Sequence, residues 1–478
     1  MKGVFNYYCK MPLPLKVTFW FFVCSIIQKG LAFFSTPIFT RLLSTSDFGL
    51  VSVYYSWNQI LSIFVTLGLV HSVSNVGLVK FENDKDGFQT AMLGLSFISF
   101  IIFLIILLTT YKYTKPIFQM DYEYICILPI DCFFVSCFGM WTLRERFEYR
   151  YKYMSIATIL NATLAVFIPI SLVYLLEDKA FGRIIGVVLC GSIFCLFSIA
   201  CIIKRNKKWI NLDYWRFALK YNIPIIPHLL SLVVLNQIDR IMIQYYCGLE
   251  KAGIYSIAYN SAAVVLILNQ ALTASYNPWF LQRLKSKYYD GVKDITNLIQ
   301  IIYIVILVLL VLFAPEIMNF MAPAEYYEGV YIIPSVASSM FFILLFNLFA
   351  PIEYFSLNTK FIGAASVIAA IVNIFLNVIF IKRFGYVAAG YTTLICYIIY
   401  AFVHYIYMLK CSKEIGCGML FDKKRIAILS LAVVLLSVLL LATYSIGIIR
   451  FLVALVILIV GIIFRKKVLR VYGALQSK

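Results

Sequence analysis

The stretch Asn222–Gly248 reads NIPIIPHLLSLVVLNQIDRIMIQYYCG, and nearly all of its side chains are apolar. About 20 predominantly apolar residues are enough to cross the hydrocarbon core of a membrane as an α-helix, so this stretch predicts a membrane span. Within it, Asp239 and Arg240 place two full charges next to each other in the chain. Ionisable groups inside membrane helices are costly and usually paired or functional, so the two residues mark a candidate site.

The whole chain has the composition of a membrane protein. It has 478 residues, of which 63% are hydrophobic and only 13% are charged, and its mean hydropathy is +0.91. Soluble domains carry about twice that charged fraction. Apolar runs between charged or turn-rich breaks predict an all-α integral membrane protein with about 14 transmembrane helices, the first of them retained rather than cleaved as a signal peptide. The predicted spans are residues 15–41, 48–79, 88–110, 122–143, 153–176, 181–203, 221–247, 252–281, 292–314, 329–354, 361–381, 387–409, 426–446 and 449–465.

The basic residues are distributed asymmetrically between alternate loops. The net charge is +19. With basic residues at the ends of spans counted in the adjacent segment, 30 of the 41 Lys and Arg residues fall in the two terminal segments and in every second loop, whereas the remaining loops hold 9. Because Lys and Arg are enriched on the cytoplasmic side, this pattern predicts a multi-pass protein of the cell (inner) membrane with both termini cytoplasmic. The anionic lipid of that leaflet is the natural partner of the basic charge, and no nucleic acid is needed to explain it.

Several kinds of chemistry are excluded by what the sequence lacks. The 12 cysteines form no CxxC pair and lie mostly in apolar segments, so neither a disulfide framework nor a metal site is expected. The sequence has no phosphate-binding loop and no HExxH zinc motif, and the predicted outer loops are too short for a catalytic domain. We therefore expect a transporter without a cofactor rather than an enzyme, and coupling to a H+ or Na+ gradient is left open.

Two segments far apart in the sequence share a pattern. RLLSTSDFGLVSVYYS (Arg41–Ser56) and YYCGLEKAGIYSIAYNS (Tyr245–Ser261) each join a helix end to an aromatic-rich helix through a short polar turn, with Gly49 and Gly253 at equivalent positions. An even number of spans separates the two, so the pattern predicts a parallel repeat of two six-helix lobes, unless it reflects only generic helix–turn–helix chemistry. The predicted lobes are residues 1–203 and 221–410, joined by a basic linker at 204–220 and followed by two helices and a basic tail in 411–478.

Four segments in this order resemble one known family. They are FFSTPIFTRLLSTSDFGLVSVY (Phe33–Tyr54), YNIPIIPHLLSLVVLNQIDRIMIQYYCGLEKAGIYSIAY (Tyr221–Tyr259), NPWF (Asn277–Phe280) and NIFLNVIFIKRFGYVAAGYTT (Asn373–Thr393). The chain resembles the polysaccharide-biosynthesis flippases of the multidrug and oligosaccharidyl-lipid exporter superfamily, which translocate lipid-linked oligosaccharide repeat units in bacteria. The resemblance implies a V-shaped pair of six-helix lobes and a polyprenyl-diphosphate-linked oligosaccharide as substrate, for O-antigen, capsule or another surface glycan. It also implies a polysaccharide polymerase and chain-length machinery as partners.

Lys29 and Arg240 are cations deep within predicted spans, and each lies in the first helix of its predicted lobe. The predicted repeat brings both toward one central cavity. An Arg guanidinium holds phosphate oxygens in a bidentate fork, and a Lys ammonium acts as a compact point charge. We therefore expect Lys29 and Arg240 to offset the charge of the diphosphate while it crosses the apolar core.

Other polar residues within predicted spans are candidates for lining a hydrophilic path for the sugars. Asn373 and Asn377 are four residues apart, so they share one face of a helix. For every candidate the alternative is a hydrogen bond between helices, which polar side chains commonly form in membrane bundles. The candidates are Gln59, His71, Asn75, Asn236, Asn373 and Asn377.

Three acids in predicted spans are candidates for a gate or a coupling site, namely Asp131, Asp239 and Glu353. For the two aspartates a structural ion pair, such as Asp131 with Arg240, is an equally good explanation, because intramembrane acids often pair. Lys360 is close enough in sequence to reach Glu353.

Prolines predict breaks in two of the spans. Pro224 and Pro227 predict a bend or an unwound turn at the start of the seventh span, and Pro169 predicts a kink in the fifth. Such breaks serve either as hinges for alternating access or as static kinks.

Two other activities within the superfamily are alternatives to the oligosaccharide flippase. A cation-coupled multidrug exporter needs intramembrane acids, but a buried Lys29 disfavours cationic drugs. A peptidoglycan lipid-precursor flippase would need the same intramembrane cations, so the sequence distinguishes it poorly from an oligosaccharide flippase. A membrane glycosyltransferase or polymerase needs a longer outer loop than this chain has, and a purely structural assembly protein has no need of two lobes with charged helices.

Overall fold

The computed structural model describes residues 12–70, 72–356, 359–457 and 459, and all regular structure within them is helical. The chain divides into two compact units, which we call unit 1 (Met1–Ile241) and unit 2 (Met242–Lys478). The boundary falls inside helix α11 (Ile226–Cys247). Most of the helix that opens the predicted second lobe therefore clusters with unit 1.

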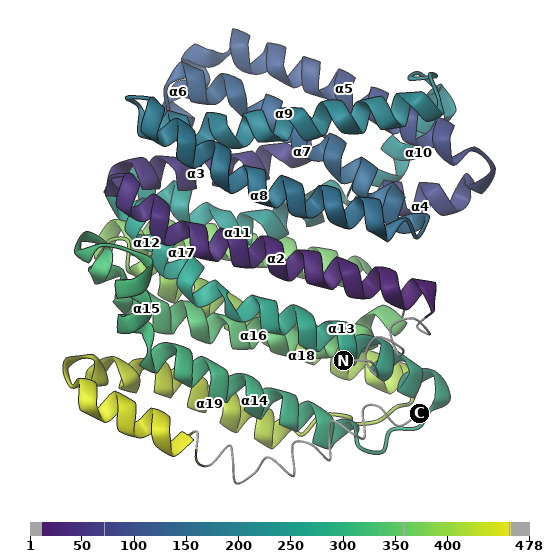
Figure 1. Cartoon of the computed structure of the whole chain (residues 1–478). Coiled ribbons are helices and arrows are strands. Elements are labelled where there is room, and N and C mark those ends of the chain that lie inside the picture. The colour runs from purple at the N-terminus through teal and green to yellow at the C-terminus, as the bar shows by residue number, and fades with distance from the viewer. Residues whose placement is uncertain (1–11, 71, 357–358, 458, 460–478) are drawn as a thin grey trace, which may run out of the picture. The chain divides into compact units, whose positions relative to one another are not determined.

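Unit 1 is a bundle of long helices in which α7 occupies a central place. Helix α7 packs against α3, α5 and α9, while α8 packs against α2 and α9 (Figure 1). Ser44 and Asp47 form a capping box at the start of α3, which satisfies backbone N–H groups that the first helical turn leaves without partners. Besides α11, the helices are α2 (Leu13–Leu42), α3 (Thr45–Val65), α4 (Val73–Lys80), η1 (Glu82–Asp84), α5 (Lys85–Thr109), α6 (Tyr111–Phe118), α7 (Tyr122–Phe147), α8 (Tyr151–Leu175), α9 (Lys179–Arg205) and α10 (Leu212–Asn222).

The contact between α8 and α9 depends on glycine. A Cβ atom on Gly186 of α9 would lie 2.5 Å from Cα of Pro169 on α8, and one on Gly182 would lie 2.9 Å from the backbone oxygen of Leu172. Small residues let the backbones of membrane helices approach closely enough for van der Waals packing. Pro169 lies inside α8, which runs on to Leu175.

Unit 2 is organised around α16, which is buried along most of its length. It packs against α12, α13, α14, α18 and α19, and α17 packs against α18. The helices are α12 (Leu249–Ala263), α13 (Val265–Ser286), α14 (Val292–Leu312), α15 (Ala314–Met321), η2 (Ala324–Ile332), α16 (Ile333–Phe355), α17 (Thr359–Phe384), α18 (Ala388–Ile415), α19 (Lys423–Leu439) and η3 (Leu440–Ser445), followed by a short apolar helix at Gly447–Ile457.

In the described part of the chain, 12 helices are long and apolar enough to cross a membrane. They correspond to 12 of the predicted spans, and the count of 14 is not confirmed. The predicted span 48–79 is instead α3 and α4, separated by a turn in which Leu67 and Gly68 have φ values of 52° and 60°. This left-handed backbone cannot continue a right-handed helix. The last predicted span, 449–465, begins in the short helix Gly447–Ile457 and extends outside the described residues.

The predicted break at the start of the seventh span is confirmed. Helix α10 ends at Asn222, a turn follows at residues 223–225, and α11 begins at Ile226. Pro224 lies in this turn, because a proline inside a helix removes a backbone donor and clashes with the preceding turn.

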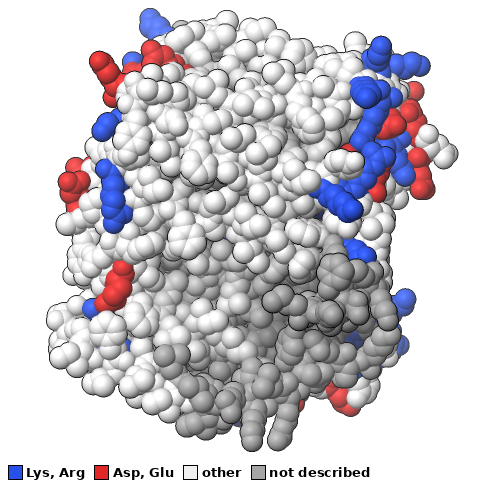
Figure 2. Space-filling model, in the orientation of Figure 1, with Lys and Arg blue, Asp and Glu red and all other residues white. Residues whose placement is uncertain are grey.

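The surface of unit 1 is that of a membrane protein. Large apolar side chains are exposed on its long helices, including Ile105 (54%), Phe167 (61%) and Leu196 (68%). Figure 2 shows charged side chains gathered toward the ends of these helices, with a broad uncharged surface between. Such a band matches the hydrocarbon core of a bilayer, so the chain is a multi-pass membrane protein.

Candidate functional site: a polar cavity in unit 1

A cavity of about 560 Å³ lies among α2, α4, α7 and α8 of unit 1. Its lining includes the polar side chains of Gln28, Asn75, Thr142 and Asn161, one from each of these helices. Polar groups in a membrane domain are expensive to expose to lipid, so they face the bundle interior or a water-filled space. The cavity therefore places several polar side chains, among apolar ones, inside the membrane helices.

A second cavity of about 600 Å³ adjoins the first, since Asn75, Leu143 and Arg146 line both. Arg146 in the last turn of α7 thus lies where the two cavities meet. Its guanidinium carbon is 4.9 Å from the centre of the Phe21 ring on α2, which is a cation–π contact. We call the 560 Å³ space the inner cavity and the 600 Å³ space the outer cavity.

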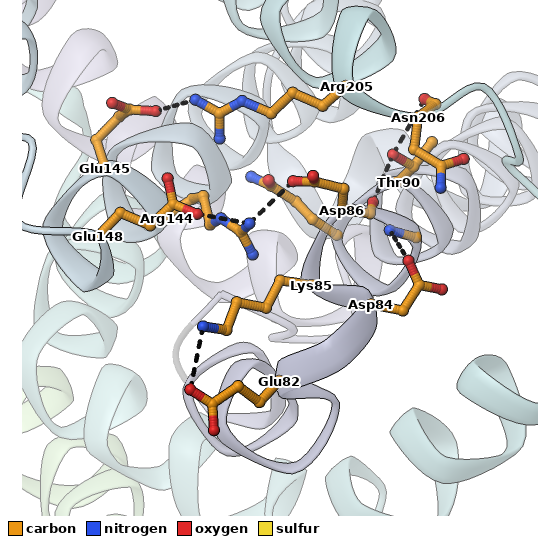
Figure 3. A network of polar contacts seen from close by, with 12 residues as sticks. Glu82, Asp84, Lys85, Asp86, Thr90, Arg144, Glu145, Glu148, Arg205 and Asn206 are labelled. Carbon is orange, nitrogen blue, oxygen red and sulfur yellow. Dashed lines mark hydrogen bonds and ion pairs between the residues drawn. The ribbon is translucent and has the colours of Figure 1, made fainter.

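A network of ion pairs beside the outer cavity connects the ends of α5, α7 and α9 (Figure 3). Arg144 lies 2.9 Å from an oxygen of Asp86 and 2.6 Å from one of Glu148. Arg205 of α9 forms an ion pair with Glu145 of α7. The side chain of Arg144 is only 4% exposed, so this network holds the helix ends of unit 1 together where the inner and outer cavities meet.

The same end of unit 1 is closed by a contact from α10. Tyr214 donates a hydrogen bond to Asp84 (2.8 Å), and Asp84 also caps the start of α5 by accepting from the backbone of Gly87. Burial, together with the hydrogen bond to Asp84, raises the pKa of Tyr214 to about 12. Tyr214 therefore stays a neutral hydrogen-bond donor at physiological pH.

Only some of the predicted site residues of unit 1 line the inner or the outer cavity. Asn75 lines both the inner and the outer cavity. Lys29 is half-buried on α2, next in sequence to the cavity-lining Gln28, but does not itself line the cavity. Gln59 is exposed on α3, and His71 lies outside the described residues.

Asp131 of α7 is buried with only 2% of its surface exposed. One of its oxygens accepts hydrogen bonds from Nδ2 of Asn58 (2.9 Å) and from the hydroxyl of Tyr54 (3.4 Å), both on α3. The other oxygen, Oδ1, has no hydrogen-bond partner in the described part of the chain. The contacts of Asp131 there do not include the alternative ion pair with Arg240.

Arg240 is 6% exposed, and its guanidinium donates to the backbone oxygen of Asn236 (2.9 Å) and to Oε1 of Gln237 (3.1 Å). The same Oε1 accepts a hydrogen bond from Ser56 of α3 (3.2 Å). Asp239 is 1% exposed. The cation of the QIDR segment therefore belongs to a chain of polar contacts between α11 and α3.

In unit 2, Asn373 and Asn377 lie on one face of α17, as their spacing predicts. Nδ2 of Asn377 donates to Oδ1 of Asn373 (3.3 Å), and Thr392 of α18 donates to Oδ1 of Asn377. All three residues are buried. This arrangement contains the hydrogen bond between helices that was the alternative to a sugar-lined path.

Glu353 of α16 is fully buried against His404 of α18. Nδ1 of His404 lies 2.8 Å and 3.1 Å from the two carboxylate oxygens. The predicted contact with Lys360 lies outside the described residues, since the side chain of Lys360 is not among them. The partner of Glu353 is thus a residue 51 positions away in the sequence.

The cavity-lining residues that the sequence analysis misses are Gln28, Thr142, Asn161 and above all Arg146. Arg146 belongs to the basic run RERFEYRYK, whose charge is fully accounted for by the predicted cytoplasmic loop. One feature of the sequence distinguishes Arg146 from Arg144. Arg144 has the carboxylate of Glu148 four residues further on, where two helical side chains can pair, whereas the residue four positions after Arg146 is not an acid.

The family model described as polysaccharide biosynthesis protein matches residues 15–284. A protein of the Lsg locus of Haemophilus influenzae is 29% identical over 151 residues, which are 30% of this chain and 38% of that protein. The lipid II flippase MurJ in its inward closed conformation has a TM-score of 0.67 and 15% identity, over 93% of this chain and 99% of that chain. An inward-facing multidrug resistance MATE family transporter of the MOP superfamily has a TM-score of 0.60 and 13% identity, over 81% and 95%.

These findings define a multi-pass membrane protein whose fold is similar to that of the flippase MurJ and of the MATE transporter. The matched segment covers more than half of the 478 residues. The chain belongs to the polysaccharide biosynthesis protein family. The family resemblance stated from the sequence is thereby confirmed.

Proposed function

We propose that this protein is a flippase that moves polyprenyl-diphosphate-linked oligosaccharide repeat units from the cytoplasmic to the outer leaflet for assembly of a surface polysaccharide. The observation that carries the proposal is the polar cavity inside the membrane helices of unit 1, in a member of this family. A sugar headgroup is too polar for the hydrocarbon core and needs such a lined path, whereas the prenyl chain stays in lipid. Alternating access then exposes the cavity to one leaflet at a time.

Lys29 and Arg240 are proposed to offset the diphosphate charge during the crossing. The half-buried position of Lys29 on α2 and the buried guanidinium of Arg240 on α11 support this role. A sugar path would use the uncharged polar residues, and a gate or an H+ or Na+ coupling site would use the buried acids. These residues are Gln59, His71, Asn75, Asn236, Asn373 and Asn377 for the path, and Asp131, Asp239 and Glu353 for the gate or coupling.

The proposed topology has about 14 spans, of which 12 form two six-helix lobes and two follow at the C-terminus, with both termini in the cytoplasm and the chain in the cell (inner) membrane. Helix α3 and the predicted span 449–465, which extends outside the described residues, are the two proposed spans beyond the 12 apolar helices. The proposed lobes are residues 1–203 and 221–410, joined by the linker 204–220, with residues 411–478 as an addition. A polysaccharide polymerase and chain-length machinery are the proposed partners.

Reconstitution of the purified full chain in liposomes tests the proposed function. The assay scores flipping of a lipid-linked oligosaccharide with and without an imposed H+ or Na+ gradient, for wild type, Lys29→Ala and Arg240→Ala. We expect flipping by wild type and its loss in both variants at normal protein levels. Transport of a cationic dye or of a peptidoglycan lipid precursor, without flipping of the oligosaccharide lipid, would replace this proposal by the multidrug exporter or the precursor flippase.

A further inference from the structure

We infer that Arg146 forms a binding site for the diphosphate group of a prenyl diphosphate lipid, where the inner and outer cavities of unit 1 meet. This inference rests on the proposed function, and it names the cation that the substrate headgroup meets in unit 1. Arg146 lines both cavities, so a ligand that passes between them comes within reach of its guanidinium.

The first argument is the pairing of charges at this end of unit 1. Lys85 pairs with Glu82, Arg150 with Glu148, and Arg205 with Glu145, and Arg144 has both Asp86 and Glu148. Within the described part of the chain, Arg146 has no carboxylate partner. Its side-chain contact is the Phe21 ring, which attracts a cation without cancelling its charge. Arg146 is therefore the cation of this group that is available to an external anion.

The second argument is the chemistry of the surrounding donors. Asn75 lines both cavities together with Arg146, and Thr142, one helical turn before Arg146 on α7, lines the inner cavity. An Arg guanidinium binds phosphate oxygens through two parallel N–H···O bonds, and the side-chain amide of Asn75 is a further neutral donor in the same lining. Glu82 and Glu148 also line the outer cavity. Glu82 forms an ion pair with Lys85, and Glu148 forms ion pairs with Arg144 and Arg150. The inner cavity, which Arg146 also lines, has no acid among its described lining residues.

The third argument is the apolar surface next to Arg146, which favours a lipid over free phosphate. Phe21, which contacts Arg146, is 44% exposed, and Phe22 and Ile26 of the same helix are 39% and 43% exposed. An amphiphile with a charged head at Arg146 can lay its hydrocarbon chain against the exposed apolar side chains of α2. A prenyl diphosphate combines the two chemistries, whereas inorganic diphosphate has only the charge.

Calorimetric titration of the purified full chain in detergent tests the site. The probes are geranylgeranyl diphosphate, inorganic diphosphate and phosphatidylglycerol, and the variants are Arg146→Ala, Arg146→Lys and Arg150→Ala. We expect geranylgeranyl diphosphate to bind Arg146→Ala about tenfold more weakly than wild type, since a charge-assisted hydrogen bond is lost. Arg146→Lys retains the positive charge but not the bidentate guanidinium, so its affinity for geranylgeranyl diphosphate is expected to lie between those of wild type and Arg146→Ala. Arg150→Ala, an exposed neighbour with a carboxylate partner, keeps the affinity of wild type.

Three results would overturn the inference. One is equal affinity of wild type and a folded Arg146→Ala variant, with folding judged by gel filtration and melting temperature. The second is that phosphatidylglycerol or inorganic diphosphate binds as tightly as geranylgeranyl diphosphate, which makes the site a general anion site. The third is a loss of affinity in Arg150→Ala as large as in Arg146→Ala. The proposed function has a separate readout: wild type that binds geranylgeranyl diphosphate but flips no oligosaccharide lipid would remove the function and leave the Arg146 site.

Discussion

Nδ1 of His404 on α18 lies 2.8 Å from Oε2 of Glu353 on α16, and both side chains are fully buried in unit 2. The rings of Phe346, Tyr400 and Phe361 pack around the imidazole. A hydrogen bond satisfies two buried polar groups at once, and removal of either group leaves the other without its partner in apolar surroundings. This pair therefore joins α16 to α18, which are two of the most extensively packed helices of unit 2.

Replacing Glu353 by Ala is expected to lower the stability of the protein, because His404 loses its hydrogen-bond partner. The expected loss is about 1–3 kcal/mol in the free energy of unfolding. Glu353→Gln keeps an oxygen that accepts from Nδ1 and is expected to lose less. Thermal unfolding of the purified variants in detergent, followed by tryptophan fluorescence, measures both. A Glu353→Ala variant that melts together with wild type would show that the pair does not stabilise unit 2.

Replacing Asp131 by Asn tests whether this acid couples transport to a H+ gradient. The Asn side chain keeps an oxygen that accepts from Asn58 and Tyr54, so the contact with α3 is retained while the ionisable group is removed. We expect the variant to flip lipid-linked oligosaccharide at the rate that wild type shows without a gradient, and to lose acceleration by an imposed pH gradient. Proteoliposome assays with and without the gradient measure this. Acceleration that persists in the variant would exclude Asp131 as the coupling group.

Gly186 is expected to be intolerant of any side chain. A Cβ atom there would lie 2.5 Å from Cα of Pro169, and backbone cannot move aside as a flexible side chain can. Gly186→Ala will therefore separate α8 from α9 and lower both the amount of folded protein in membranes and its melting temperature. Gly191→Ala on the same helix is the matched control, since its Cβ would meet Phe134 at 3.5 Å, an ordinary contact. Equal expression and melting of the two variants would contradict this account of the helix contact.

The parts of the fold that follow from local chemistry could be predicted from the sequence. Spans follow from runs of apolar residues, and the break before α11 follows from Pro224. The turn at Leu67 and Gly68, which divides the predicted second span, has an apolar sequence, so hydropathy could not reveal it. The hydrogen bond between Asn373 and Asn377 likewise follows from a spacing of one helical turn.

The candidate site depends on contacts between distant segments, and these were largely beyond prediction. The sequence suggested Lys360 as a partner for Glu353 because it is close in the chain, and that contact lies outside the described residues. The described partner His404 comes from another helix, which spacing in the sequence could not indicate. Arg146 lies in a run of basic residues whose charge is explained by their place in a predicted cytoplasmic loop, so the sequence did not single it out. Only the positions of its neighbours' carboxylates distinguish it from Arg144 and Arg150.

Arg144 and Arg150 are expected to differ sharply in their effect on stability, although both form ion pairs with Glu148. The side chain of Arg144 is 4% exposed and also binds Asp86, while that of Arg150 is 52% exposed. Arg144→Ala removes charge-assisted hydrogen bonds from a buried network and is expected to cost about 2–3 kcal/mol in the free energy of unfolding. Arg150→Ala removes a solvated ion pair and is expected to cost at most about 1 kcal/mol. Thermal unfolding at low and high salt measures both, and salt should reduce only the smaller effect, since buried pairs are screened much less. Equal losses in the two variants would mean that the network in Figure 3 is no stronger than a surface ion pair.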